Sequence, residues 1–284
     1  MPYMLKISMP CKIKILAENY AYKTQFAEWG FSAFIDFNGT QLLFDTGQSG
    51  DCVLKNAKTL NTSLENIDAI ILSHGHYDHT GGLNKILKAI GNKKIFAHKE
   101  IFTKRSTLEN GKKTNSNPFL KYKNFFLSNN YPFVFCDEIV QIKKDLYLIG
   151  NVPITNSIEK ISDHFIISID NIKAPDTFND ELHLVLDLPQ GLLIITGCAH
   201  RGLINIATHI KNTLNKNIFG IMGGTHLYEA NHDQLNCVVN FIKKENIQFF
   251  SPSHCTGMEN IFTLKNIFPD IVFPSFCGST FTLG

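Results

Sequence analysis

The sequence has little of several features that identify common classes of protein. Its 284 residues contain a single tryptophan, carry a net charge of only +2, and include no Cys-x-x-Cys pair. A nearly neutral chain is not typical of nucleic-acid-binding or membrane-surface proteins, because both usually carry a concentrated basic patch. No stretch approaches the ~20 apolar residues of a transmembrane helix. We therefore expect neither nucleic acid nor a membrane as a partner, and expect a small molecule instead.

Features of a secreted protein are also absent. The N-terminal segment carries Lys6, Lys12 and Lys14, where a signal peptide would have an uninterrupted apolar region and a small-residue cleavage site. The seven cysteines are an odd number and lie far apart along the chain. This distribution favours reduced thiols in a cytosol over a disulfide framework. The sequence thus predicts a cytoplasmic protein.

Short apolar runs alternate with amphipathic stretches, and 44% of the residues are hydrophobic, which is enough for a large core. This predicts one domain over 1–284, since layered α/β folds often reach ~250 residues as a single domain. The pattern fits a four-layer αββα sandwich better than a doubly wound sheet, because no Gly-x-Gly-x-x-Gly opens the first helix. We expect strands at 31–37, 41–45 (after an Asn38-Gly39 turn), 68–72, 94–97, 133–135, 146–149, 164–169, 182–187, 192–196, 218–222 and 247–251, and helices at 50–60, 83–90, 201–214 and about 231–244.

The segment 103–131 differs from the rest of the chain. It is rich in Lys, Asn and Ser, contains Gly111 and Pro118, and has only a weak apolar pattern. Such a composition is typical of connecting segments. We expect an insertion or a mobile loop here.

The sharpest feature is a cluster of potential metal ligands directly after the apolar run 68–72. His74, His76, Asp78 and His79 fall within six residues. Imidazole and carboxylate groups suit zinc, iron or manganese. In an extended segment alternate residues share a face, so the first three side chains would project together, and a turn into a helix would swing His79 toward a second metal. The spacing therefore predicts a metal site at the end of a strand.

Three further histidines also follow apolar runs, each in a Gly- or Pro-containing loop. They are His200 in TGCAH, His226 in GGTH and His254 in SPSHCTG. Functional residues often lie on such loops, and a catalytic metal leaves room for distant ligands to complete its coordination. We expect these histidines to share one site with the cluster.

At these residues the sequence resembles the metallo-β-lactamase superfamily, whose signature matches His74-x-His76-x-Asp78-His79. The upstream Phe44-Asp45-Thr46-Gly47 is similar to its first motif, in which the aspartate supports the ligand loop without binding metal. His254 is similar to its last metal-binding histidine. The resemblance implies a centre of two divalent metal ions, with zinc expected first and iron or manganese as alternatives.

The resemblance extends to one subfamily. The segments AEWGFSAFID, LFDTGQSG, LSHGHYDHTGGL, TGCAHRGLIN, MGGTHL and PSHCTG, between about residues 18 and 260, are similar to the metal-dependent hydrolases of β-lactamase superfamily II. Some members carry the name 7,8-dihydropterin-6-yl-methyl-4-(β-D-ribofuranosyl)aminobenzene-5′-phosphate synthase. The motifs are specific for the superfamily and weak for the substrate.

One position departs from the superfamily pattern. A Gly-Asp usually supplies a carboxylate that bridges the two metals, whereas the corresponding strand end here reads Gly197-Cys198, with His200 two residues on. Cys198, His200 or His226 could each bind metal, and the sequence does not choose between them. The middle-motif histidine is equally open, because His164 and His183 match its place only loosely.

The resemblance implies a hydrolase that acts on a small ester, a lactone or a phosphorylated, pterin-like metabolite. Asp78 would orient the nucleophilic water and carry a proton, and His226 or His254 would donate a hydrogen bond to the oxyanion. A non-haem diiron redox protein is the alternative, but such proteins usually have Glu at the position of His76, and no flavodoxin domain is present. A metal-bound sensor without turnover is a third possibility.

Overall fold

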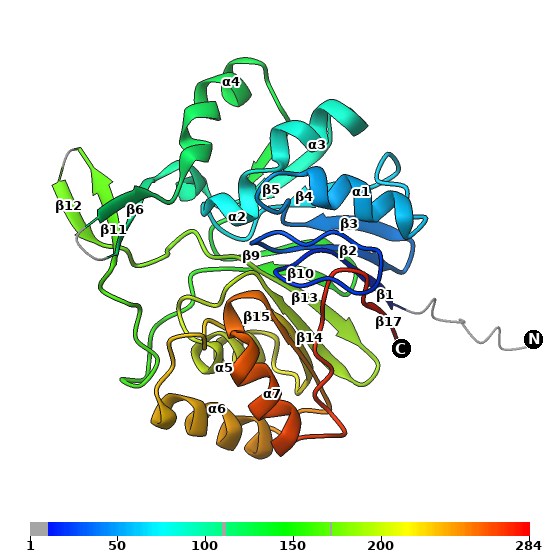
Figure 1. Cartoon of the computed structure of the whole chain (residues 1–284), viewed down its shortest axis with the longest axis vertical. Coiled ribbons are helices and arrows are strands. Elements are labelled where there is room, and N and C mark those ends of the chain that lie inside the picture. The colour runs from blue at the N-terminus through cyan, green and yellow to red at the C-terminus, as the bar shows by residue number, and fades with distance from the viewer. Residues whose placement is uncertain (1–10, 110–111, 171) are drawn as a thin grey trace, which may run out of the picture.

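Two β-sheets packed face to face form the centre of the molecule, which is known here from a computed structural model that describes residues 11–109, 112–170 and 172–284 (Figure 1). The first sheet has seven strands in the order β17-β1-β2-β3-β4-β5-β8. These are β17 (Thr280–Leu283), β1 (Cys11–Ala17), β2 (Ser32–Phe37), β3 (Thr40–Phe44), β4 (Ala69–Ile71), β5 (Lys94–Ala97) and β8 (Phe133–Phe135).

The second sheet has six strands in the order β16-β15-β14-β13-β10-β9. Its members are β16 (Phe249–Ser253), β15 (Ile218–Gly224), β14 (Gly191–Thr196), β13 (His183–Leu188), β10 (Leu146–Ile149) and β9 (Ile139–Lys143). The pairs β14–β15 and β15–β16 are parallel, so these three strands end at the same edge of the sheet. The functional site is built at that edge.

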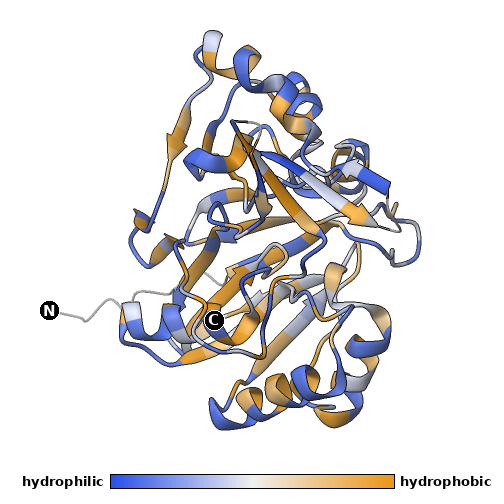
Figure 2. Ribbon diagram, turned by 90° about the vertical axis from the view of Figure 1, so that its left-hand side faces the viewer, coloured by the Kyte–Doolittle hydropathy of each residue, from blue (hydrophilic) through white to orange (hydrophobic). Residues whose placement is uncertain are grey.

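Helices cover the outer face of each sheet and complete four layers. Helices α1 (Asp51–Thr59) and α3 (Leu83–Ile90) pack on the first sheet, and α5 (Leu203–Leu214), α6 (His232–Lys244) and α7 (Met258–Ile267) pack on the second. Three buried apolar clusters fill the gaps between neighbouring layers, and Figure 2 shows the hydrophobic colour concentrated in the strands. The αββα sandwich expected from the sequence is confirmed.

A third, smaller sheet stands beside the sandwich, at the left of Figure 1. Its four strands, in the order β12-β11-β6-β7, are β12 (Ile172–Pro175), β11 (Phe165–Ile169), β6 (Lys104–Glu109) and β7 (Lys112–Asn115). The segment 103–131, expected as an insertion or a mobile loop, therefore carries regular structure, which also includes the 3₁₀ turn η2 (Pro118–Tyr122) and the helix α4 (Lys123–Ser128). That it is an insertion stays a prediction.

Local turn chemistry explains the first hairpin. Asn38 and Gly39 have φ angles of 51° and 75°, the left-handed values that a two-residue hairpin turn needs. They connect β2 to β3 in the register Phe37↔Thr40, as the sequence predicts. Within the described ranges, no helix is long and apolar enough to cross a membrane.

Candidate metal centre

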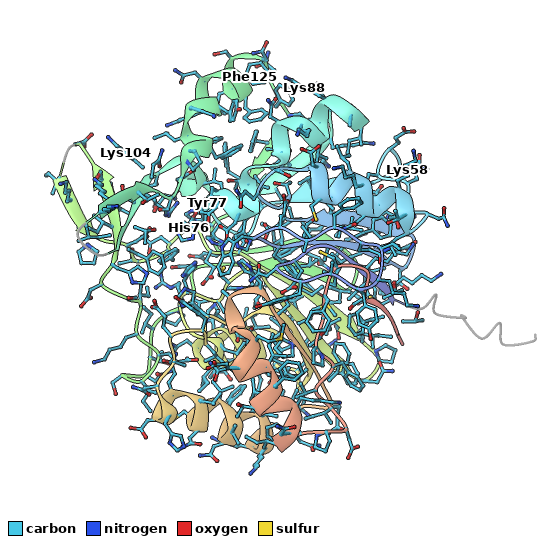
Figure 3. The ribbon with its side chains drawn as sticks, viewed as in Figure 1. Lys58, His76, Tyr77, Lys88, Lys104 and Phe125 are labelled. Atoms are coloured by element: carbon cyan, nitrogen blue, oxygen red, sulfur yellow. The ribbon has the colours of Figure 1, made fainter. Side chains whose placement is uncertain are left out.

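The ligand loop begins where β4 ends and runs into the four-residue helix α2 (Tyr77–Thr80). The ring centroid of His74 lies 4.8 Å from that of His76 and 4.2 Å from that of His79, and all three side chains are buried. His76 immediately precedes α2 and has an extended backbone. Its side chain lines the pocket described below. Figure 3 shows His76 where the two halves of the sandwich meet the third sheet.

The second sheet brings its candidate ligands from the ends of its parallel strands. Cys198 and His200 follow β14, His226 follows β15, and His254 opens the 3₁₀ turn η3 (His254–Thr256) after β16. A Cβ atom at Gly197 would lie 2.2 Å from Ser73 Oγ, so only glycine permits this close approach of the two sheets. The two sheets thus present their loops to one shared space.

Most of the predicted ligands come together there. Groups of three donors, with all ligand atoms of a group within 4.8 Å of one another, are formed by His74, His79 and Cys198; by His74, His76 and His200; by Asp78, His79 and His254; and by Cys198, His254 and Cys255. The groups share members, so they form one continuous cluster. Sequence analysis did not single out Cys255, although it lies in the same SPSHCTG motif.

Hydrogen bonds set the orientation of three imidazoles. Ser73 Oγ donates to Asp45 Oδ2 at 2.7 Å, so the 2.9 Å contact between Ser73 Oγ and His74 Nδ1 requires the imidazole to donate. His79 Nδ1 lies 2.7 Å from Asp45 Oδ2, and His254 Nδ1 lies 3.0 Å from the side-chain oxygen of Asn19. With the proton on Nδ1, each ring keeps a lone pair on Nε2.

These lone pairs fit a metal ion. The Nε2 atoms of His74, His76 and His200 are fully buried and have no hydrogen-bond partner among the described residues. An unpaired buried polar atom is costly, and one ring nitrogen from each of these three histidines lies within 4.8 Å of the others, which fits a shared cation. In His74 and His79 the other ring nitrogen contacts a hydroxyl or a carboxylate, which is the arrangement that metal-ligating histidines usually show.

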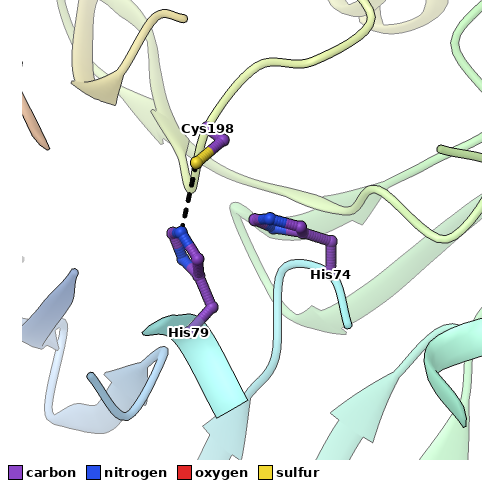
Figure 4. A group of neighbouring side chains, drawn as sticks. All are labelled: His74, His79 and Cys198. Carbon is purple, nitrogen blue, oxygen red and sulfur yellow. Dashed lines mark hydrogen bonds between the residues drawn. The ribbon is translucent and has the colours of Figure 1, made fainter. Parts of the chain in front are cut away.

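Cys198 lies between the histidines of the ligand loop and His254, and belongs to donor groups with both. Its Sγ lies 3.1 Å from His79 Nε2, and Figure 4 shows this contact with His74 beside it. Cys255 Sγ lies 3.3 Å from the carbonyl oxygen of Cys198. All seven cysteines of the chain are free thiols.

Asp45 contacts the ligand loop at two points. It is fully buried and accepts hydrogen bonds from Ser73 N and Ser73 Oγ, both at 2.7 Å, as well as from His79 Nδ1. Its own backbone has a φ of 57°, a left-handed value that is uncommon outside glycine. One carboxylate therefore holds both ends of the ligand loop.

Three further buried acids accept from backbone amides of the ligand-bearing loops, and sequence analysis missed them. Glu18 accepts from His254 N at 2.7 Å, Glu181 accepts from His200 N at 2.7 Å, and Asp180 accepts from the amide of Gly75, also at 2.7 Å. Burial raises the pKa of Glu18 to about 7, of Glu181 to about 7 and of Asp180 to about 6. Each acid stands outside any motif, so only the fold reveals its role.

A buried arginine joins the third sheet to this network. Arg105 on β6 donates to Asp176 and to Asp180, both at 2.7 Å. Because Asp180 also accepts from Gly75, the chain of contacts runs from the third sheet to the turn between the first two ligands of the loop. Burial opposes the charge on Arg105, but the two carboxylates outweigh it and raise the arginine pKa.

The histidines of the cluster fall into two kinds, those whose pKa is lowered and one whose pKa is raised. Burial lowers the pKa of His76 to about 3, and it also lowers the pKa values of His74 and His200, with nearby imidazoles adding to the effect. Burial would lower the pKa of His79 as well, but the Asp45 carboxylate outweighs it and raises that pKa to about 9. In the absence of a cation, a proton would therefore occupy His79 first.

A pocket of about 400 Å³ opens onto the cluster. His76, Asp78, Cys198, His200 and His254 line it together with His226. The ring of His226 lies 4.4 Å from that of His200, yet His226 belongs to none of the donor groups formed by the described residues.

The two loosely matched histidines differ in position. His164 lines the pocket, where its Nδ1 lies 2.7 Å from Ser162 Oγ. His183 is fully buried on β13, with its Nε2 3.9 Å from Glu181 Oε2, and does not line the pocket. Neither histidine belongs to a donor group among the described residues.

Several known proteins are similar to this chain in sequence. The family model of the metallo-beta-lactamase superfamily matches residues 30–203. An uncharacterized protein of Methanocaldococcus jannaschii, MJ0448, is 33% identical over 260 residues, which cover 90% of this chain and 94% of the relative. The 7,8-dihydropterin-6-methyl-4-(beta-D-ribofuranosyl)-aminobenzene-5'-phosphate synthase of the same organism is 31% identical over 264 residues, covering 88% of this chain and 90% of the enzyme.

A solved structure agrees with these matches. Tm1679, described as a metal-dependent hydrolase of the beta-lactamase superfamily, superposes with a TM-score of 0.81 and 27% identity, covering 95% of this chain and 98% of its own. The fold, the ligand loop and the sequence matches lead to one conclusion, which confirms the resemblance seen in the motifs: the chain belongs to the metallo-β-lactamase superfamily.

Proposed function

We propose that the protein is a hydrolase that uses water activated by two divalent metal ions to cleave a small ester, a lactone or a phosphorylated metabolite. The observation that supports this most strongly is a pair of adjacent donor groups: His74, His76 and His200 in one, Asp78, His79 and His254 in the other. When bound, the metals would polarise the scissile carbonyl or phosphoryl oxygen and lower the pKa of water from 15.7 to about 7.

Cys198 would be a ligand available to both proposed metal ions. Its Sγ lies within 4.8 Å of the ligand nitrogens of His74 and His79, and within the same distance of His254 and Cys255 in another group. Thiolate is a soft ligand that favours zinc or iron over magnesium or manganese. Zinc is therefore the metal we propose first. A thiolate here would take the place of the carboxylate that the superfamily pattern usually supplies at this strand end.

The chain's own residues supply the proton chemistry. Asp78 lines the pocket, with its Oδ2 3.3 Å from His254 Nε2, so its carboxylate can hold the attacking water in line and carry its proton to the leaving group. His226 also lines the pocket without belonging to a donor group among the described residues. Its imidazole is free to donate a hydrogen bond to the oxygen that gains negative charge.

The pocket suits a small molecule. Its volume of about 400 Å³ is in the range of small-molecule sites. The name of the methanogen synthase refers to a dihydropterin compound that carries a phosphate, so a pterin-like phosphorylated metabolite falls within the proposed substrate class. We propose that the protein acts in the cytoplasm, without a nucleic-acid or membrane partner, in keeping with its seven free thiols.

Metal removal and restoration test this function. The protein is stripped with a chelator and reloaded with zinc, manganese or iron, and each form is assayed against an aryl ester, a lactone and a phosphodiester. We expect hydrolysis only in the reloaded forms, with about two metal ions per chain at full activity. Metal content and activity are measured on the same samples.

Two results would contradict the hydrolase. Oxygen consumption driven by a reductant, with no hydrolysis anywhere in the panel, would assign the protein to redox chemistry. Stoichiometric metal binding with neither hydrolysis nor redox turnover would assign it to sensing. Bound iron alone distinguishes none of these, because a two-metal hydrolytic site of imidazole and carboxylate also accepts iron.

A further inference from the structure

Two large aromatic side chains stand exposed on the wall of the metal-centre pocket. Trp29 is 47% exposed and Tyr228 is 61% exposed, and both line the pocket. Exposed aromatic faces gain stability when another ring covers them, because stacking adds to the burial of apolar area. Their location next to the ligand cluster suggests a role in ligand binding.

Trp29 is fixed in place by residues of the metal centre. Its ring centroid lies 5.3 Å from that of His254. The next residue, Gly30, donates to the side chain of Asn19, which also accepts from His254 Nδ1. Beyond it, Phe31 N donates to the carbonyl oxygen of Asp78 at 3.2 Å. The indole is therefore held beside the proposed site of chemistry.

Tyr228, in the loop after β15, is held against the turn η3 that begins with His254. Its backbone N–H donates to the carbonyl oxygen of Cys255 at 3.1 Å. Gly257 approaches so closely that an added Cβ would lie 3.1 Å from the Cα of Tyr228. Both aromatic residues are thus attached to the short segment that begins with His254.

The charge of the pocket wall limits what can lie against these two rings. None of the described residues that line the pocket is a lysine or an arginine. The acids that line it are Asp78 and Glu229, and Glu229 follows Tyr228 directly. Away from the proposed metals, an anionic group would meet the carboxylate of Glu229 with no lysine or arginine beside it, whereas an uncharged ring would not be repelled.

We propose that Trp29 and Tyr228 bind an uncharged, planar aromatic group of the substrate, which projects from the bond that is cleaved. This rests on the proposed hydrolase function and specifies its substrate class. The two residues act as specificity determinants, and the cleaved bond itself lies deeper, at the ligand cluster.

The single tryptophan of the chain makes the proposal directly measurable. Phenyl phosphate and cyclohexyl phosphate carry the same phosphate group and differ in the planarity of the ring. Their dissociation constants are measured by calorimetry on the metal-loaded protein, and the emission of Trp29 is recorded in parallel. We expect phenyl phosphate to bind about 3–10-fold more tightly, as a stacked pair contributes, and to change the emission of Trp29.

Variants assign the preference to the two residues. Trp29→Ala and Tyr228→Ala should each reduce the ratio of the two dissociation constants toward one, and Trp29→Phe should restore part of it. Phe262→Ala is the matched control, because Phe262 on α7 is 53% exposed and does not line the pocket. That control should keep the full ratio.

The result separates this proposal from the hydrolase. Failure of phenyl phosphate to bind at millimolar concentration, equal affinity for both ligands, or a preference that survives both alanine variants would overturn the aromatic site. If the preference is present and depends on Trp29 and Tyr228 while the ester, lactone and phosphodiester panel shows no turnover, the aromatic site stands and the hydrolase is wrong.

Discussion

The first sheet supplies its share of the metal centre from the continuous stretch His74–His79, whereas the second sheet supplies Cys198 and His200 from one loop and His254 from another. The two halves are also held differently. In the continuous half, Asp45 accepts hydrogen bonds from two side-chain atoms, Ser73 Oγ and His79 Nδ1, and from the backbone amide of Ser73. In the separate half, buried acids accept from backbone amides only.

This difference shows two ways to hold a ligand. A carboxylate bound to His79 Nδ1 fixes which nitrogen carries the proton, and so prepares Nε2 for a metal. A carboxylate bound to the amide of His200 or of His254 fixes the position of the loop and does not itself hold the ring. We therefore expect the continuous half to control metal affinity and the separate half to control geometry.

The largest effect is expected from loss of a ligand in the continuous half. His76→Ala should lower hydrolysis and metal affinity by more than the ~10–100-fold that loss of a supporting residue costs. The fold should persist, because His76 belongs to none of the apolar clusters. Activity, metal content and circular dichroism check this. His232→Ala, on an exposed histidine at the start of α6, should behave as the wild type.

A second large effect should come from the network that ties the third sheet to the continuous half. Arg105→Met leaves Asp176 and Asp180 buried without their cation, and removing one member of a buried ion pair costs about 3–5 kcal/mol. Urea unfolding should show that loss in the free energy of unfolding. Lys104→Met, at the exposed neighbouring position on β6, is the control. A similar small change in both variants would mean that the network is not stabilising.

Asp45→Asn tests the side-chain type of support. The amide cannot accept from three donors as the carboxylate does, so metal affinity should fall by ~10–100-fold. Metal titration with a competing chelator measures this. Unchanged affinity and activity would refute the assignment of Asp45.

Glu181→Gln tests the backbone type of support and should have the smallest effect. Glutamine keeps one carbonyl oxygen for the amide of His200 and loses the second contact, to the amide of Arg201. Loss of one hydrogen bond costs about 0.5–1.5 kcal/mol, so we expect a change of about 2–10-fold in kcat/KM with metal affinity nearly unchanged. A loss of metal affinity as large as that of Asp45→Asn would remove the distinction between the halves.

The same difference decides what could be predicted from the sequence. The continuous half stands in one motif, and Asp45 stands in another, so both were recognisable before the fold was known. The separate histidines were recognisable because each follows an apolar strand. Glu18 and Glu181 were not, since an isolated acid carries no signal until the fold buries it beside a ligand loop.

The fold shows a parallel division. Strands that are buried on both faces, such as β14, can be predicted from their continuous apolar runs. The two edge strands of the third sheet cannot, because β7 is exposed along its whole length and reads KKTN, and β12 is exposed as well. Their pairing with β6 and β11 depends on contacts that the local sequence does not encode.

The hydrogen bond from His254 to Glu18 also sets an order of events. It closes a separation of 236 residues, whereas Asp45 reaches Ser73 across 28. Contacts between distant parts of a chain form late, and synthesis releases the N-terminal part first. We therefore expect the His74–His79 stretch to be made before β16 and η3. If the position completed by His254 fills last, a full complement of metal would report that the protein has folded from β1 to η3.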